Sequence, residues 1–231
     1  MNTPSKSELR TLMEKHNGSC VSMFLPTQRT GMETQKAQLS LRNHIREAEH
    51  RLFLDNLSSR QVEEFLEPIQ ALLDDEQFWL DPGDGLALFR SPDLFRYYRW
   101  PFHLKEQIIV TDHFYLKPLL PALANDERFY ILALSQKENA GAGRASNNIG
   151  EVVPAAYYGR VESLFIAIDQ ELWGIFNPIT SALHVHSVAR YRDDDLLDVA
   201  ATQTLLHNGS VYVVEHTKVP GGGPLAAVFR Y

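Results

Sequence analysis

The sequence predicts an α/β fold divided into two domains. Helical periodicity is strongest between Glu33 and Leu54, where apolar residues recur every three or four positions. Short β-branched and aromatic runs of strand length alternate with such helical segments along the chain. A small, polar, glycine-containing segment from Gln136 to Asn148 has the composition of a linker and separates the two domains.

The composition is that of an ordinary globular protein. The 231 residues are 44% apolar and 22% charged, and 29 acidic side chains against 22 basic ones give a formal net charge of −7. This length predicts one or two domains. The acidic balance argues against a large electrostatic footprint for nucleic acid, so any RNA contact has to be a local patch.

Cysteine usage and hydropathy favour a cytoplasmic protein. The single cysteine, Cys20, excludes an internal disulfide and suits a reducing compartment. Residues Met1 to Glu8 lack the apolar core of a signal peptide. No apolar run approaches the ~20 residues that a membrane span needs, so we expect no membrane contact.

The predicted N-terminal domain, residues 1–128, mixes helices and strands. Ser7 is the expected N-cap of its first helix, and Pro68 is expected either to begin a new helix or to kink the third one. The expected helices are Glu8–Lys15, Glu33–Leu54 and a segment from Ser58 or Ser59 to Leu73; the expected strands are Cys20–Leu25, Leu86–Phe89, Leu94–Trp100 and Gln107–Val110, followed by a short or broken helix within Tyr115–Leu123.

Residues 129–150 are expected to form a residual strand and a linker. Phe129–Leu134 is a continuous apolar run, typical of a buried strand. Because exposed strand edges invite aggregation, we expect this strand to join a neighbouring sheet or to pair with another copy of the chain as a homodimer.

The predicted C-terminal domain, residues 151–231, ends on two strands. A helix closing at Asn208-Gly209 precedes them, and the last strand is expected to end the chain inside its own core. The expected elements are a short helix at Val152–Tyr157, strands at Val161–Ile168, Trp173–Phe176 and Leu183–Val188, a helix introduced by Asp193-Asp194-Asp195 and running to Leu206, and the strands Ser210–Val214 and Pro224–Tyr231.

Acidic and imidazole side chains suggest metal sites, but a simpler interpretation is favoured for each. Asp193–Asp195 with Asp198 offer oxygen ligands for a divalent cation, yet acidic residues also cap helices and favour the first turn. His184 and His186 share one face of the expected strand. Zinc needs three or four ligands, and neither His207 nor His216 stands at a recognisable spacing, so no metal and no cofactor is expected.

Two other motifs are also expected to be structural. Cys20 lacks a visible basic partner that would activate the thiol. Gly221-Gly222-Gly223 precedes a strand instead of the helix N-terminus that a phosphate cradle requires, so it is expected to be a loop.

Basic residues supply the candidate RNA contacts. They are interleaved with Tyr97, Tyr98 and Trp100, whose rings are suited to stacking. The alternative is a solvated face whose aliphatic stems cover apolar surface. The candidates are Arg29, Lys36, Arg42, Arg46, Arg96 and Arg99.

Three sets of segments resemble known translation factors. The strand Val21–Thr27 ending in Leu-Pro-Thr, the helix Leu41–Glu49 and the strand Asp84–Phe89 look like the first domain of archaeal and eukaryotic class I release factors. The other two sets look like a bacterial archaeo-eukaryotic release factor family, related to those factors and to Pelota. They are Phe114–Pro121 with Phe129–Ser135, and Gly159–Phe165 with Leu196–Leu206 and the ending Ala226–Tyr231.

The resemblance implies a C-terminal α/β/α sandwich and a missing centre. Such proteins resemble the release factors in having a central ribonuclease-H-like domain, most of which is absent between Leu134 and Gly143. The Gly-Gly-Gln motif that promotes peptidyl-tRNA hydrolysis does not occur here, nor does the stop-codon-reading motif Asn-Ile-Lys-Ser.

Three functions remain open from the sequence. The first, favoured by the resemblance, is a non-catalytic release-factor-like protein that associates with the ribosome or tRNA in translation stress, rescue or hibernation. The second is a hydrolase or nuclease-like enzyme with a cleft between the domains. The third is a structural protein that folds and dimerises without a catalytic role.

Overall fold

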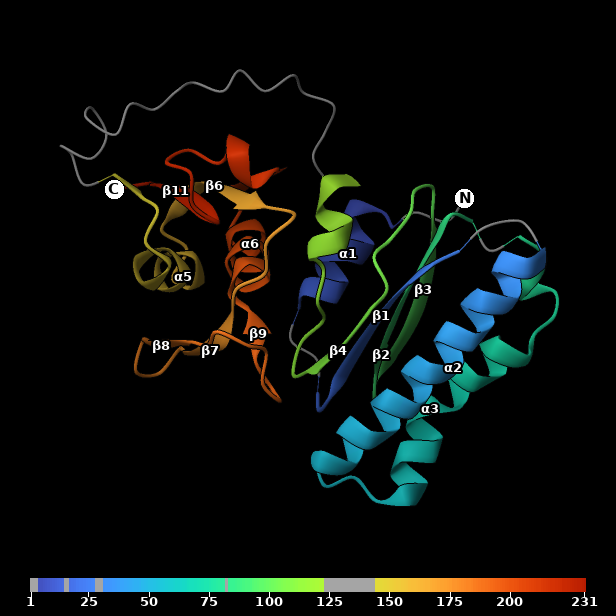
Figure 1. Ribbon diagram of the computed structural model, residues 1–231. Coiled ribbons are helices and arrows are strands. Elements are labelled where there is room, and N and C mark those ends of the chain that lie inside the picture. The colour runs from blue at the N-terminus through green and yellow to red at the C-terminus, as the bar shows by residue number, and fades with distance from the viewer. Residues whose placement is uncertain (1–3, 15–16, 28–30, 82, 123–143) are drawn as a thin grey trace. The chain divides into compact units, whose positions relative to one another are not determined.

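The computed structural model describes residues 4–14, 17–27, 31–81, 83–122 and 144–231. Helices and strands are mixed throughout these ranges, so the fold belongs to the α/β class that the sequence predicts. The chain divides into two compact units, Met1–Phe114 and Tyr115–Tyr231, which we call unit 1 and unit 2 (Figure 1). Among the described residues, no helix combines the length and apolar character needed to cross a membrane.

Unit 1 is built on a four-stranded antiparallel sheet. Its strands lie in the order β3-β2-β1-β4, so β1 is an inner strand that pairs with β2 and β4. The predicted strands and helices of this part are confirmed, with small differences at their ends. The elements are α1 (Lys6–Met13), β1 (Cys20–Pro26), α2 (Gly31–Leu54), α3 (Ser59–Asp74), the 3-10 helix η1 (Phe78–Leu80), β2 (Gly85–Ser91), β3 (Leu94–Trp100) and β4 (Gln107–Thr111).

Helices cover both faces of the unit 1 sheet. Buried side chains of α2 and α3 form one hydrophobic core with Met23 and Leu88 of the inner strands. Because side chains alternate along a strand, Phe24 and Phe89 point to the opposite face, where their rings meet edge to face at 5.8 Å. The helix α1 lies on that second face and buries Leu9 (Figure 1).

Capping boxes fix where two of these helices begin. Ser5 Oγ accepts a hydrogen bond from the Glu8 N–H, and the Ser5 N–H donates to Glu8 Oε2 at 2.8 Å. The prediction of Ser7 as N-cap is therefore wrong, because Ser5 is the serine that stands three residues before a glutamate. Ser58 caps α3 in the same way, and Pro68 lies inside α3 without starting a new helix.

Unit 2 contains two sheets. The larger one has the order β10-β6-β11-β5, in which β10 is parallel to β6 and the other pairs are antiparallel. The smaller, antiparallel one has the order β8-β7-β9. The elements are the 3-10 helix η2 (Lys117–Ala122), β5 (Ala145–Ser146), α5 (Ile149–Tyr157), β6 (Val161–Ala167), β7 (Trp173–Asn177), β8 (Ala182–Val185), β9 (Asp194–Asp195), α6 (Leu196–Leu206), β10 (Ser210–Val214), the 3-10 helix η4 (His216–Lys218) and β11 (Leu225–Phe229).

Both helices of unit 2 lie on one face of the larger sheet. The helices α5 and α6 contact each other as well as the sheet. Along β6, Leu164 and Ile166 are buried, whereas Phe165 between them is half-buried and its ring stacks on that of Tyr212 at 4.8 Å. Within the described residues, α-helices therefore cover one face of this sheet. The resemblance implies an α/β/α sandwich, in which helices cover both faces.

The end of α6 follows the prediction with one difference of detail. Asn208 has a φ of 59° and takes the left-handed conformation expected of Gly209. Gly209 is needed for space instead, because a Cβ there would lie 2.5 Å from Thr204 Cγ2 and 2.9 Å from the Val161 carbonyl oxygen. The strand β11 is an inner strand, but Tyr231 is 78% exposed, so the prediction that the chain ends inside its core is wrong for its last residues.

The division between the units falls earlier than the predicted domain boundary after Arg128. Residues 115–122, expected in the N-terminal domain, belong to unit 2. The physical reason is a set of hydrogen bonds from this segment to α6, among them the Leu116 N–H donating to Asp198 Oδ1 at 3.0 Å. The expected strand Phe129–Leu134 and the linker up to Gly143 lie outside the described residues, so the expected strand pairing stays a prediction.

Candidate functional site

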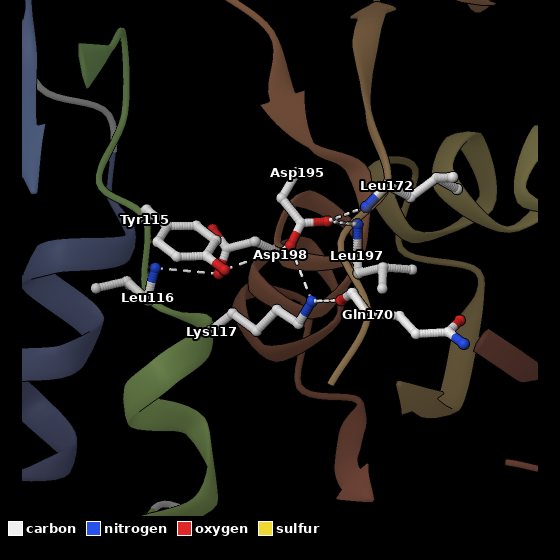
Figure 2. Close-up of polar contacts among 8 residues, drawn as sticks. All are labelled: Tyr115, Leu116, Lys117, Gln170, Leu172, Asp195, Leu197 and Asp198. Carbon is white, nitrogen blue, oxygen red and sulfur yellow. Dashed lines mark hydrogen bonds and ion pairs between the residues drawn. The ribbon is translucent and has the colours of Figure 1, made fainter. Parts of the chain in front are cut away.

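Four buried polar side chains meet at the beginning of α6 in unit 2 (Figure 2). We call Tyr115, Lys117, Asp195 and Asp198 the polar cluster. Tyr115 lies just before η2, Lys117 is the first residue of η2, Asp195 is the N-cap of α6, and Asp198 lies in the first turn of that helix. The side chain of Lys117 is 1% exposed and that of Asp195 is 0% exposed.

An ion pair lies at the centre of the polar cluster. The ammonium Nζ of Lys117 lies 2.9 Å from Asp195 Oδ2 and also donates to the carbonyl oxygen of Gln170. The phenol of Tyr115 donates to the same Asp195 oxygen at 3.4 Å. A buried charge is costly unless it is paired and hydrogen-bonded, and here the two opposite charges satisfy each other.

Backbone N–H groups hold the remaining carboxylate oxygens. Asp195 Oδ1 accepts hydrogen bonds from the N–H groups of Leu172 and Leu197, both at 3.1 Å. The bond from Leu197 is the helix cap. The first turn of a helix favours negative charge as well, so the capping interpretation of this acidic segment is confirmed for Asp195.

The same contacts argue against a divalent cation at Asp195. One oxygen of this carboxylate is taken by two N–H groups, and the other is taken by the ammonium of Lys117 and the phenol of Tyr115. The ammonium of Lys117 therefore supplies the positive charge that a bound cation would supply. Asp198 uses Oδ1 to accept the Leu116 N–H.

Tyr115 is held in its protonated form. Burial raises the pKa of the phenol well above its usual value, and the negative charges of Asp195 and Asp198 raise it further. The phenol therefore acts as a hydrogen-bond donor and is unsuited to act as a general base. The polar cluster anchors the beginning of η2 and the residues just before it to the N-terminus of α6.

A histidine–aspartate pair lies between β8 and β9. His186 Nδ1 lies 2.8 Å from Asp193 Oδ2, and the Arg190 N–H donates to the same oxygen at 2.9 Å. The side chain of Asp193 is 1% exposed and that of His186 is 16% exposed. A buried carboxylate at Nδ1 orients an imidazole ring, as it does in general-base dyads.

The other predicted metal ligands do not gather around this pair. His184 is exposed on β8, His207 contacts the carbonyl oxygen of Gln203 at the end of α6, and His216 contacts Asp169. His186 lies just beyond the last residue of β8, so the predicted strand face holds only the first histidine of the pair.

Cys20 and the Gly221–Gly223 motif both occupy structural positions, as expected. The thiol of Cys20 is fully buried, and burial raises its pKa to about 12. A protonated, inaccessible thiol is unreactive. Gly221–Gly223 lies between η4 and β11 as the expected loop, and Gly221 and Gly222 have φ values of 85° and 70°.

The structure separates Arg96 from the candidate RNA-contact residues on α2. Lys36, Arg42 and Arg46 are exposed on α2, whereas Arg29 lies outside the described residues. Along β3, Tyr97 packs against the α2–α3 core, so its neighbour Arg96 points to the opposite face of the sheet. Arg96 and the α2 residues are therefore separated by the sheet.

Two of the aromatic residues expected to extend that patch are buried inside unit 1. Tyr98 and Trp100 are each 1% exposed, which leaves no ring face for a base. Arg99 Nη2 donates to the carbonyl oxygen of Phe78 at 3.0 Å, and its guanidinium lies 4.7 Å from the centre of the Phe78 ring. For this residue the packing interpretation fits better than the RNA-contact interpretation.

Sequence reasoning missed Tyr115, Lys117 and the pairing of His186 with Asp193. The sequence around Tyr115 and Lys117 carries no local signal for the cluster, because its partners come from the start of α6. Nothing in the sequence pairs Lys117 with Asp195, which lies 78 residues further along the chain.

Comparisons with known proteins give little beyond these observations. No model of a known family matches the chain, and no curated protein matches it. Among solved structures, one chain described as "Archaeal protein" aligns over 100% of this chain and 99% of its own length, with 13% sequence identity and a TM-score of 0.36. A likeness this weak carries no argument about function.

Proposed function

We propose that this chain is a non-catalytic, release-factor-like protein of the cytoplasm that associates with the ribosome or tRNA in translation stress, rescue or hibernation. The observation that carries the non-catalytic part is the polar cluster. Its lysine, tyrosine and Asp195 carboxylate are buried and hydrogen-bonded to one another. A buried ion pair of this kind offers no accessible nucleophile or base.

The translational part of the proposal rests on the resemblance of three sets of segments to release factors and their bacterial relatives. The chain lacks Gly-Gly-Gln, and its Gly221-Gly222-Gly223 loop is followed by Pro224. A protein with release-factor-like segments and without the hydrolytic motif is expected to bind the translation machinery without releasing peptides.

Cosedimentation with 70S ribosomes tests the proposal. We expect the purified chain to pellet with ribosomes at low salt and to be released as the salt concentration rises, because phosphate contacts depend on ionic strength. An unrelated acidic protein of similar mass is the control for trapping in the pellet. A chain that stays in the supernatant with ribosomes from both growing and stressed cells would contradict the proposal.

The pair His186–Asp193 favours a second candidate, a hydrolase or nuclease-like enzyme. Its geometry, with Nδ1 2.8 Å from a buried carboxylate, is that of an oriented general base. If the chain cleaves RNA or peptidyl-tRNA, we expect His186→Gln to lower the rate at least about a hundredfold. A measured turnover that survives this substitution would remove this assignment of the base.

A further inference from the structure

Three arginines lie on neighbouring strands at one end of the larger sheet of unit 2. Arg144 directly precedes β5, Arg230 directly follows β11, and Arg160 directly precedes β6. Because β11 lies between β6 and β5 and is antiparallel to both, the three positions fall at the same end of the sheet. The Phe229 N–H donates to the Arg144 carbonyl oxygen at 2.7 Å, and the Arg230 N–H donates to the Arg160 carbonyl oxygen at 2.9 Å. We call Arg144, Arg230 and Arg160 the arginine row.

The arginine row is exposed, and one of its members has a structural contact. Arg230 Nη2 donates to the carbonyl oxygen of His207 at 2.6 Å and so satisfies a carbonyl group at the end of α6. Within the residues that the structure describes, no acidic side chain pairs with the row, and the side chains of Arg144 and Arg160 make no hydrogen bond. Packing and capping therefore do not account for these two guanidinium groups.

Acidic groups near the arginine row are fewer than its arginines. The segments that meet at this end of the sheet carry one acidic side chain, that of Glu162; they are residues 144–146, 157–162, 206–210 and 229–231. The carboxylate of the last residue, Tyr231, adds a second negative charge. Glu151 lies in the first turn of α5, at the opposite end of that helix from Arg160, and accepts a hydrogen bond from Ser146 Oγ at 2.6 Å. This end of the sheet is therefore basic in a protein of net charge −7.

The arrangement of the row opposes folding in the absence of an anionic partner. Neighbouring strands lie about 4.8 Å apart, so the row extends over about 10 Å. Like charges that face each other on neighbouring strands are destabilising. An anion with several charges would remove this repulsion, so charge complementarity selects a polyanion.

An exposed aromatic ring stands beside the arginine row. Tyr231 directly follows Arg230 and is 78% exposed. A tyrosine this open buries little apolar area and adds little to the stability of the fold. Guanidinium groups beside an exposed ring are the combination with which proteins hold single-stranded nucleic acid, because the charges contact phosphates and the ring stacks on an unpaired base.

We propose that this end of the sheet binds single-stranded RNA. Arg144 and Arg160 contact phosphates, Arg230 contributes its charge while it holds the end of α6, and Tyr231 stacks on a base. This inference rests on the proposed function, for which it names the contact surface, and it places that surface in unit 2.

Fluorescence anisotropy with a labelled 12-nucleotide oligouridine tests the inference on the full chain. The test variant is R144Q/R160Q, which removes two charges and keeps the bond from Arg230 to the His207 carbonyl oxygen. The charge-matched control is R42Q/R46Q, which removes two exposed arginines from α2 in unit 1. Thermal melting checks that each variant is folded.

We expect R144Q/R160Q to bind the RNA at least about tenfold more weakly than the unmodified chain. The slope of log affinity against log salt should fall by about 1.4, or about 0.7 for each of two lost phosphate contacts. R42Q/R46Q should stay within about twofold of the unmodified chain, because α2 belongs to the other unit.

Two substitutions of Tyr231 test the stacking contact. Tyr231→Ala should weaken binding about fivefold or more, since it removes the ring. Tyr231→Phe keeps the ring and should bind as the unmodified chain does. Equal affinity of the two variants would show that the ring does not contact the RNA.

Either of two results would overturn the inference as a whole. The first is a folded chain that does not bind the oligonucleotide, which is also the result expected if the partner is an acidic protein. The second is equal affinity for R144Q/R160Q and the unmodified chain. Cosedimentation separates this failure from that of the proposed function: R144Q/R160Q pelleting with ribosomes as well as the unmodified chain contradicts only the inference, whereas an unmodified chain that does not pellet contradicts the proposed function.

Discussion

Burial decides the ionisation of His44, a residue of α2. Its side chain is 9% exposed, and its Nε2 lies 3.5 Å from Glu106 Oε1. Desolvation lowers the pKa of His44 below 6.5, although Glu106 opposes this shift. The neutral imidazole is therefore the form that the folded state accommodates.

Acidification is expected to destabilise the fold through His44. Between the lowered pKa of the folded state and the pKa of about 6.5 in the unfolded chain, the unfolded state binds the proton more readily. The free energy of unfolding should therefore fall as the pH drops below about 6.5. Urea unfolding of the unmodified chain and of His44→Gln at pH 7.5 and 5.5 measures this effect. The variant should lose less stability between the two pH values, and equal losses would contradict the assignment.

Removing the ammonium of Lys117 should strongly destabilise the fold. Lys117→Met leaves the buried carboxylate of Asp195 without its ammonium partner, and breaking a buried pair in this way costs about 3 to 5 kcal/mol. Urea unfolding followed by circular dichroism gives the loss. The double variant K117M/D195N should recover part of it, because an asparagine side chain can still cap α6. A loss below about 1 kcal/mol for Lys117→Met would show that the ion pair is not essential to unit 2.

At the scale of elements, local signals place the helices and strands well. The apolar stripe of α2 and the capping box of α3 depend on residues three or four positions apart, and both can be recognised in the sequence. The three-residue spacing of Ser5 and Glu8 likewise encodes the capping box of α1, which the prediction of Ser7 as N-cap does not use.

The capping box of α3 provides a test at this scale. The Ser58 N–H donates to Gln61 Oε1 at 2.9 Å, and Ser58 Oγ accepts from the Gln61 N–H. Ser58→Ala should lower the free energy of unfolding by about 1 kcal/mol. Its neighbour Ser59, the exposed first residue of the helix, gives the control Ser59→Ala, for which we expect almost no change. Equal effects of the two substitutions in urea unfolding would argue against the capping role.

At the scale of the whole molecule, the sequence predicts the α/β class but not the contacts that build the candidate site. Lys117 and Asp195 meet only because the beginning of η2 packs against α6. Residue spacing does not encode this tertiary contact. The same contacts assign residues 115–122 to unit 2 instead of the expected N-terminal domain. By contrast, strand alternation already implied that Arg96 and Tyr97 face opposite sides of a sheet.

The proposed function joins these scales, because the lysine, the tyrosine and the Asp195 carboxylate of the polar cluster are buried and hydrogen-bonded to one another. The proposal therefore separates binding from hydrolysis. It requires an interaction with the translation machinery that leaves the ester bond of peptidyl-tRNA intact.

The most direct test mixes the purified chain with 70S ribosomes that carry peptidyl-tRNA labelled in the peptide, and then pellets the ribosomes. We predict that the chain enters the pellet and that the label stays on the tRNA, at the rate of loss seen without the chain. Release of the labelled peptide by the chain, or a chain that remains in the supernatant, would contradict the proposal of binding without catalysis.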